Sequence, residues 1–210
     1  VGRVICFPVL AIVDVPNPAP VLALIDGLRR YDLTVFVSTN AAERGLAMVA
    51  ARLGGWPAGV PAAAVGASTA AALAHGGVAA TVAPGGRYDS EGLLDSPALQ
   101  AVDGRRILIF RGQGGRELLA DELRRRGAHV DYAEVYRRAR PPGRWEAAAE
   151  RDPPHVMVVT SGEGLDNLYQ MTGEDQRPRL LATALVVISN RIPDQARRMG
   201  FTKPVIAPHA

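Results

Sequence analysis

Five turns rich in glycine, serine and threonine follow apolar segments of this sequence, and their residue types suit the binding of anions. In a parallel α/β sheet, ligands bind beyond the carboxyl ends of the strands, where such turns present backbone N–H groups at the N-termini of helices. Serine and threonine also cap helices, so a purely structural role is the alternative for each turn. The five turns are Ser38–Asn40, Gly66–Thr69, Arg111–Gly115, Ser161–Glu163 and Ser189–Arg191.

The candidate binding groups in these turns are hydroxyls, amides, carboxylate, guanidinium and glycine backbone. A nucleotide- or flavin-binding module, or a two-lobed solute-binding protein, would use the glycines of the third turn for a phosphate. The spacing of those glycines differs from Gly-x-Gly-x-x-Gly, which argues against a dinucleotide site. The candidate residues are Ser38, Asn40, Ser68, Thr69, Arg111, Gly112, Gln113, Gly114, Ser161, Gly162, Glu163, Ser189 and Arg191.

The segment 106–142 predicts the unit that positions the third turn. Ile107–Phe110 is an apolar run typical of a strand buried on both faces of a parallel sheet. After the glycines, an amphipathic helix is predicted, in which Asp121 and Glu122 precede Arg125 and Arg126 by four residues and are expected to pair with them. A second extended segment follows. Strand, turn, helix and strand in this order indicate a βαβ unit and a parallel α/β sheet.

Apolar runs elsewhere predict the remaining strands, and Cys6 is expected to be buried within the first of them. Helices are expected at 21–29, 41–53, 69–74 and 89–99, with further helices starting near 163, 176 and 192. The other predicted strands are Arg3–Phe7, Val35–Ser38, Ala63–Val65, Val156–Thr160, Ala184–Ile188 and Pro204–Ala207.

Two halves of the chain match at a constant spacing of 123 residues. Residues 35–38 correspond to 158–161, Met48 to Met171, and Gly77 to Gly200. Two copies of one α/β unit, related by duplication, explain this spacing. The first copy has no counterpart of the strand and helix at 105–127, so we expect a longer natural protein with a further strand and helix before Val1.

The composition limits the classes of function. The 210 residues are 48% hydrophobic and 21% charged, typical of a water-soluble protein, and no run is long enough to span a membrane. The net charge is +3, but the arginines are dispersed, which argues against nucleic acid. One cysteine excludes a disulfide framework and favours the cytoplasm, and no metal-binding motif is found.

An ordered set of motifs makes the chain similar to the uroporphyrinogen-III synthase family. Each motif alone is weak, but they follow the order of that family over nearly the whole sequence. They are VFVSTNA at 35–41, AVGASTA at 64–70, DSEGLL at 89–94, FRGQGGRELL at 110–119, AEVY at 133–136, TSGEGL at 160–165 and ISNRI at 188–192.

The resemblance implies two flavodoxin-like, three-layer domains joined by a two-stranded β-ladder, with the active site in the cleft between the domains. One domain would comprise residues 17–134. The other would comprise 1–8 and 143–210, without its N-terminal strand and helix. The ladder would be formed by 9–16 and 135–142.

The resemblance also implies a cofactor-free, monomeric lyase of tetrapyrrole biosynthesis. Such an enzyme closes hydroxymethylbilane, a linear tetrapyrrole with eight carboxylates, to uroporphyrinogen III with inversion of ring D and loss of water. Tyr136 matches the tyrosine of the family and is the candidate proton donor to the leaving hydroxyl. Thr69, Ser38 and Ser161 match family positions, and Arg111 would pair with a substrate carboxylate, as would Arg191. An inactive regulatory homologue is the remaining alternative.

Overall fold

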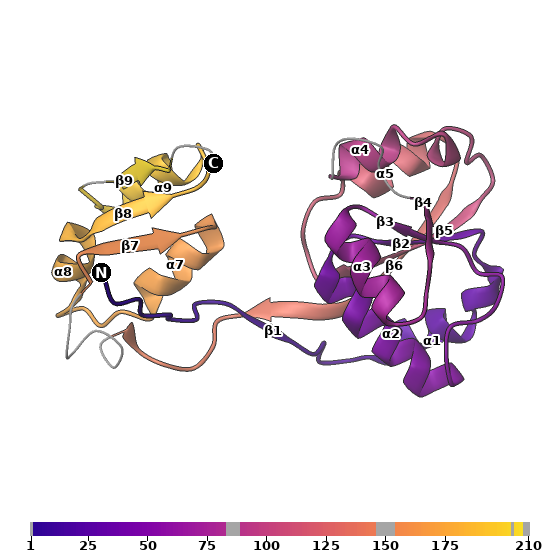
Figure 1. Ribbon diagram of the computed structural model, residues 1–210, viewed down its shortest axis with the longest axis horizontal. Helices are drawn as coiled ribbons and strands as arrows, with labels where there is room; N and C mark the ends of the chain where they lie inside the picture. The colour runs from indigo at the N-terminus through magenta and orange to yellow at the C-terminus, as the bar shows by residue number, and fades with distance from the viewer. Residues whose placement is uncertain (1, 83–88, 146–153, 203, 208–210) are drawn as a thin grey trace. The chain divides into compact units, whose positions relative to one another are not determined.

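The computed structural model describes residues 2–82, 89–145, 154–202 and 204–207. The chain divides into two compact units, Ile12–Arg138 and Val1–Ala11 with Ala139–Ala210 (Figure 1). No helix within the described ranges is long and apolar enough to cross a membrane.

The unit Ile12–Arg138 is built on a six-stranded sheet with the strand order β1-β6-β5-β2-β3-β4. Every pairing among β2 to β6 is parallel, as the βαβ pattern of the sequence predicts. The strands are β1 (Ala11–Val13), β2 (Leu33–Phe36), β3 (Ala62–Ala64), β4 (Ala80–Val82), β5 (Arg106–Gly112) and β6 (His129–Ala139).

Both faces of this sheet are covered by helices. Successive residues of its central strands point to opposite faces, and the residues on both faces are apolar. Leu108 and Phe110 belong to the core cluster that α1, α2 and α3 complete. Ile107 and Ile109 belong to a second cluster, with α4, η2 and α5. The helices are α1 (Ala19–Asp26), η1 (Leu28–Arg30), α2 (Thr39–Leu53), α3 (Ala67–His75), α4 (Ser90–Leu94), η2 (Pro97–Leu99) and α5 (Leu118–Arg125).

Gly45 allows α2 to approach the sheet closely. Phe36 and Phe110 are partners in the register of β2 and β5, and their rings stack with centroids 4.5 Å apart. A Cβ atom at Gly45 would lie 2.7 Å from the Phe110 ring, which is closer than real Cβ contacts. A glycine at this position therefore sets the distance between the aromatic pair and the helix whose N-terminus carries Ser38.

The second unit contains the parallel sheet β7-β8-β9, with helices on one face in the described residues. Met157 and Val159 point into a core with all three helices, whereas Val158 on the other face is 66% exposed. The strands are β7 (Val156–Val159), β8 (Ala184–Val187) and β9 (Pro204–Ile206), and the helices are α7 (Gly162–Gln170), α8 (Arg177–Ala182) and α9 (Ile192–Met199).

The parallel α/β fold is confirmed, and its element bounds follow the predicted spacing. Both ends of β7 lie 123 residues after those of β2, and α7 begins 123 residues after α2. Of the two segments predicted to form a ladder, 9–16 contains β1 and 135–142 contains the end of β6, and these strands are neighbours in the sheet.

Three predictions were wrong, namely the strand at 3–7, the burial of Cys6 and the Asp121–Arg125 pair, and one strand was missed. Residues 2–8 form no strand. Residues 2–5 and Phe7 line, together with β7, a hollow of about 820 Å³, and Cys6 is exposed. An apolar run forms a strand only with a hydrogen-bonded neighbour, and residues 2–8 pair with no strand of the sheet β7-β8-β9. The predicted Asp121–Arg125 pair is replaced by Asp121–Arg124, at 3.7 Å, because Arg125 pairs with Glu122. Strand β4 was not predicted.

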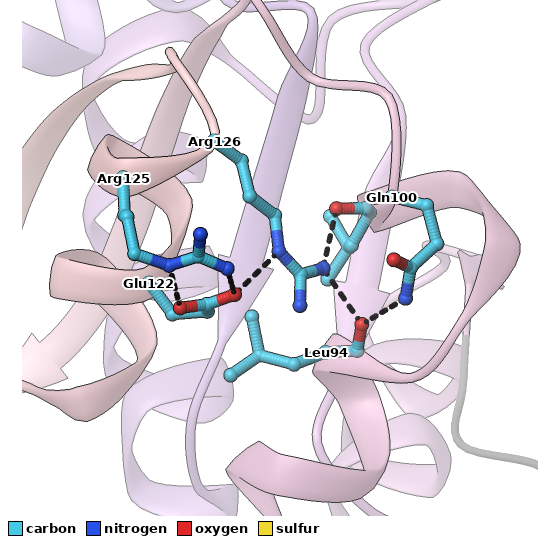
Figure 2. Close-up of polar contacts among 6 residues, drawn as sticks. Leu94, Gln100, Glu122, Arg125 and Arg126 are labelled. Carbon is cyan, nitrogen blue, oxygen red and sulfur yellow. Dashed lines mark hydrogen bonds and ion pairs between the residues drawn. The ribbon is translucent and has the colours of Figure 1, made fainter.

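Arg126, at the C-terminal end of α5, ties that helix to the segment that contains α4 and η2 (Figure 2). Its Nη1 donates to the carbonyl oxygens of Leu94, at 2.9 Å, and Leu99, at 2.8 Å. Its Nε donates to Glu122 at 2.8 Å, and the Gln100 amide also donates to Leu94. One side chain thus holds two carbonyl groups that no regular element satisfies.

We expect Arg126→Gln to lower the free energy of unfolding of this unit by about 1–3 kcal/mol, because a part-buried carbonyl loses its donor. Arg125→Gln is the matched control: Arg125 shares the carboxylate of Glu122, but its side chain is 72% exposed, so its removal should change stability little. Urea unfolding of both variants measures the difference. Equal losses would contradict the role given to Arg126.

The same cluster predicts a pH dependence of stability. Hydrogen bonds from Arg125, and then from Arg126, lower the pKa of Glu122 from 4.5 to about 2. A carboxylate with a lowered pKa stabilises the fold above its unfolded-state pKa, and this contribution is lost as the pH falls through the folded-state value. The stability gap between the wild type and Glu122→Gln should therefore shrink between pH 5 and about pH 2. A gap independent of pH, measured by urea unfolding, would refute this assignment.

Candidate functional site

Nine of the predicted site residues lie at the carboxyl ends of neighbouring strands in the unit Ile12–Arg138. Because β6, β5, β2 and β3 are adjacent and parallel, the turns that follow them share one edge of the sheet. We call this edge, with the turns after β2, β3 and β5, the carboxyl edge. Its predicted members are Ser38, Asn40, Ser68, Thr69, Arg111, Gly112, Gln113, Gly114 and Tyr136.

Tyr136 and Ser38 are brought into contact there, from strands that are separated by β5. Their hydroxyl oxygens are 3.3 Å apart, and either group can be the donor. The oxygen of Ser38 also accepts a hydrogen bond from the backbone N–H of Ala41, at 3.1 Å, and thereby caps α2. The proton of Tyr136 is available to another group when Tyr136 does not donate it to Ser38, as is the case when Ser38 is the donor.

Gly112 makes room for the ring of Tyr136. The two residues are partners in the register of β5 and β6, where an irregularity follows Arg111. A Cβ atom at Gly112 would lie 2.5 Å from Cε2 of the tyrosine. The backbone N–H of Gln113 donates to the carbonyl oxygen of Tyr136, at 2.7 Å. The glycine turn and the tyrosine therefore form one packed unit, and Tyr136 is 4% exposed.

Arg111 is buried and paired within the protein. Its Nη1 donates to Glu117 at 2.9 Å, and its Nη2 and Nε donate to the carbonyl oxygens of Gly114 and Gly112. The guanidinium lies over the ring of Tyr132, 4.4 Å from its centroid, and the hydroxyl of Tyr132 donates to Glu117. The predicted pairing of Arg111 with a substrate carboxylate would have to compete with Glu117.

The same contacts shift two pKa values in opposite directions. The hydrogen bond from Tyr132, helped by that from Arg111, lowers the pKa of Glu117 against the opposing effect of burial. Burial, followed by the hydrogen bond to Glu117, raises the pKa of Tyr132. Glu117 therefore carries its negative charge at neutral pH, and Tyr132 keeps its proton.

The turn after β3 is divided between the core and the surface. Thr69 is buried, whereas Ser68 is exposed and lines a hollow of about 690 Å³ between α2 and α3, with Glu43 and His75. Asn40 is exposed in the first turn of α2. Thr69 is thus buried in this conformation, as Tyr136 is, whereas Ser68 and Asn40 are accessible.

The second unit holds the other five predicted residues, again after neighbouring parallel strands. Ser161 caps α7 by accepting from the N–H of Gly164 at 3.0 Å, as Ser38 caps α2. Gln195 of α9 donates to the carbonyl oxygen of Gly162, at 3.1 Å, and so connects the turn after β7 with the helix after β8. The five residues are Ser161, Gly162, Glu163, Ser189 and Arg191.

Three residues of these networks were not predicted: Glu117, Tyr132 and Gln195. Glu117 follows Arg111 by six residues, and its proximity to the glycine turn was a usable signal. Tyr132 approaches Arg111 through the register of β6 on β5, and Gln195 approaches Gly162 through the packing of α9 on α7. Neither approach can be read from local sequence.

Comparisons with known proteins agree on one family. The family model described as "Uroporphyrinogen-III synthase HemD" matches residues 2–210. The uroporphyrinogen-III synthase of Salmonella typhimurium is 35% identical over 213 residues, which cover 97% of this chain and 85% of that protein. That of Escherichia coli is 38% identical over 155 residues, which cover 70% of this chain and 61% of that protein.

Solved structures of the same name share the fold. A mutant uroporphyrinogen III synthase from Thermus thermophilus gives a TM-score of 0.61 at 23% identity and covers 95% of this chain and 81% of its own. The structure of uroporphyrinogen-III synthetase from Helicobacter pylori gives a TM-score of 0.62 at 14% identity, and the match covers 95% of this chain and 84% of that protein's chain. With the match of the family model over residues 2–210, these relatives establish that the chain belongs to the uroporphyrinogen-III synthase family.

Proposed function

We propose that this protein is a lyase of tetrapyrrole biosynthesis that closes hydroxymethylbilane to uroporphyrinogen III, with inversion of ring D and loss of water. The observation that carries the proposal is the family match over residues 2–210, together with 35% identity to a named synthase over 97% of the chain. The grouping of the predicted residues at strand ends in each unit supports it.

Backbone N–H groups at helix N-termini are the proposed ligands of the substrate carboxylates. The helices α2, α3, α7 and α9 each begin after a parallel strand, and an N-terminus carries unpaired N–H groups and a partial positive charge. Many modest donors suit a flexible substrate with eight carboxylates better than one strong site. The accessible side chains proposed to assist are Asn40, Ser68, Gln113, Ser161 and Arg191.

Tyr136 is the proposed proton donor to the departing hydroxyl. Its phenol hydroxyl can give a proton to the leaving oxygen as the C–O bond breaks and water departs. Ring closure later releases one proton from the attacked pyrrole, which restores the donor. Ser38 supports this role when it donates to the phenol oxygen, because the phenol proton then points elsewhere.

Family membership favours this activity over a nucleotide- or flavin-binding module or a solute-binding protein. We also propose that the two units arose by duplication and that segments 9–16 and 135–142 join them as a ladder. The monomeric state and the cytoplasmic location stay predictions.

The activity itself is tested by adding hydroxymethylbilane to the purified chain and separating isomers I and III by chromatography. We expect isomer III in excess, formed faster than isomer I arises without protein, because spontaneous closure gives the uninverted isomer. Formation of isomer I alone, at the spontaneous rate, would reject the proposal and favour an inactive homologue.

Tyr136→Phe tests the proton donor. We expect kcat for isomer III to fall by about 10²-fold, the lower end of what general acids contribute, with a small change in KM. Tyr31→Phe is the matched control. It removes a hydroxyl that donates to Asp131 at 2.8 Å, next to the amino end of β2, and should leave kcat unchanged. A wild-type rate in Tyr136→Phe would remove the general-acid role.

A further inference from the structure

We infer that Arg111 is a positioning residue: it fixes the glycine turn 112–115 and, through that turn, the place of Tyr136. The inference rests on the proposed function for its catalytic consequence, although the contacts that carry it are independent of the activity. It differs from the sequence-based prediction, in which the guanidinium binds a substrate carboxylate directly.

The guanidinium of Arg111 makes hydrogen bonds along its edge and packs one face against an aromatic ring. Each of its three nitrogens donates within the protein, to Gly112, Glu117 and Gly114, and the side chain is 6% exposed. The ring of Tyr132 covers one face. To bind a substrate anion, the buried guanidinium of Arg111 would have to exchange one of these acceptors, and the acceptor that it leaves would lose its donor.

Arg111 and its partners Glu117 and Tyr132 come from three elements and close a triangle. Arg111 belongs to β5, Glu117 lies at the N-cap of α5, and Tyr132 belongs to β6. Tyr132 donates to the second oxygen of the carboxylate that Arg111 binds, so the two contacts are compatible. The glycine turn runs between two corners of this triangle, from Arg111 to Glu117.

The turn needs this support because its backbone is unusual. Gly114 and Gly115 have φ angles of +70° and +107°, which residues with a side chain rarely adopt. Glycine adopts them easily, but it also has the most backbone freedom, so the turn can move unless other groups hold it. Arg111 restricts this motion, because it donates hydrogen bonds to the carbonyl oxygens on both sides of Gln113, those of Gly112 and Gly114. A fixed turn is the result.

The glycine turn contacts Tyr136 in two ways. Gly112 faces the ring, and the N–H of Gln113 donates to the tyrosine carbonyl at 2.7 Å. Displacing the turn moves both contacts, and with them the hydroxyl that lies 3.3 Å from Ser38. Because catalysis is sensitive to shifts of about 1 Å, Arg111 should affect the rate without touching substrate.

A double-mutant cycle separates positioning from substrate binding. We expect Arg111→Gln to lower kcat for isomer III by about 10-fold with KM changed less than about twofold, and to have little further effect in Tyr136→Phe. Arg116→Gln is the matched control from the position directly after the turn, with a side chain 65% exposed, and should behave as wild type. A raised KM with unchanged kcat, or additive effects in the cycle, would overturn the inference.

A second readout does not depend on activity. The chain has five tyrosines, and in protein labelled with ¹³C-tyrosine the signal of Tyr136 is identified by its loss in Tyr136→Phe. Arg111→Gln, or Glu117→Gln if the first variant does not fold, should shift or broaden that signal, whereas Arg116→Gln should not. An unchanged signal overturns the inference even in an active enzyme. A wild type that makes only isomer I rejects the proposed function instead, and the signal still decides the role of Arg111.

Discussion

Parallel pairing of β5 with β2 on one side and β6 on the other is the constraint on which the candidate site depends. It places Ser38, Gly112 and Tyr136, which are distant in sequence, at one edge of the sheet. A shift of one residue in register would turn every side chain of a strand to the opposite face. The stacked pair Phe36 and Phe110 would then be lost, so the packing of the core fixes the geometry of the carboxyl edge.

Rigidity at this edge suits a reaction in which orientation matters more than acid–base strength. The bilane closes spontaneously to the uninverted isomer, so the protein must above all hold one conformation of a flexible chain. Three features restrict motion at this edge before substrate binds. They are the capped helices, the glycine turn held by a buried arginine, and the tyrosine that packs on a glycine. Serine caps recur in the second unit, where Ser161 does for α7 what Ser38 does for α2.

Much of the fold could be predicted, because the strands of a parallel sheet are continuous apolar runs and the turns after them carry glycine or capping residues. β5, α5 and the cap Asp89 of α4 follow from such local signals. Where a signal needed a distant partner, prediction failed: residues 4–7 are apolar but unpaired in a sheet, and β4 is short and rich in small residues. The same limit applies to the site. The turns were found, but Arg111 was given a substrate as its partner: Tyr132 cannot be placed beside it without the register of β6 on β5, and the nearby Glu117 was overlooked.

The central claim is that the carboxyl edge of the sheet receives the tetrapyrrole. Amide chemical shifts of ¹⁵N-labelled protein, recorded without oxygen before and after addition of uroporphyrinogen III, test this most directly. The account predicts that the largest shifts fall in the turns at 38–41, 66–69 and 112–115. Shifts concentrated instead at the amino ends of the same strands, near Asp32, Arg105 and His129, with the turns unchanged, would contradict it.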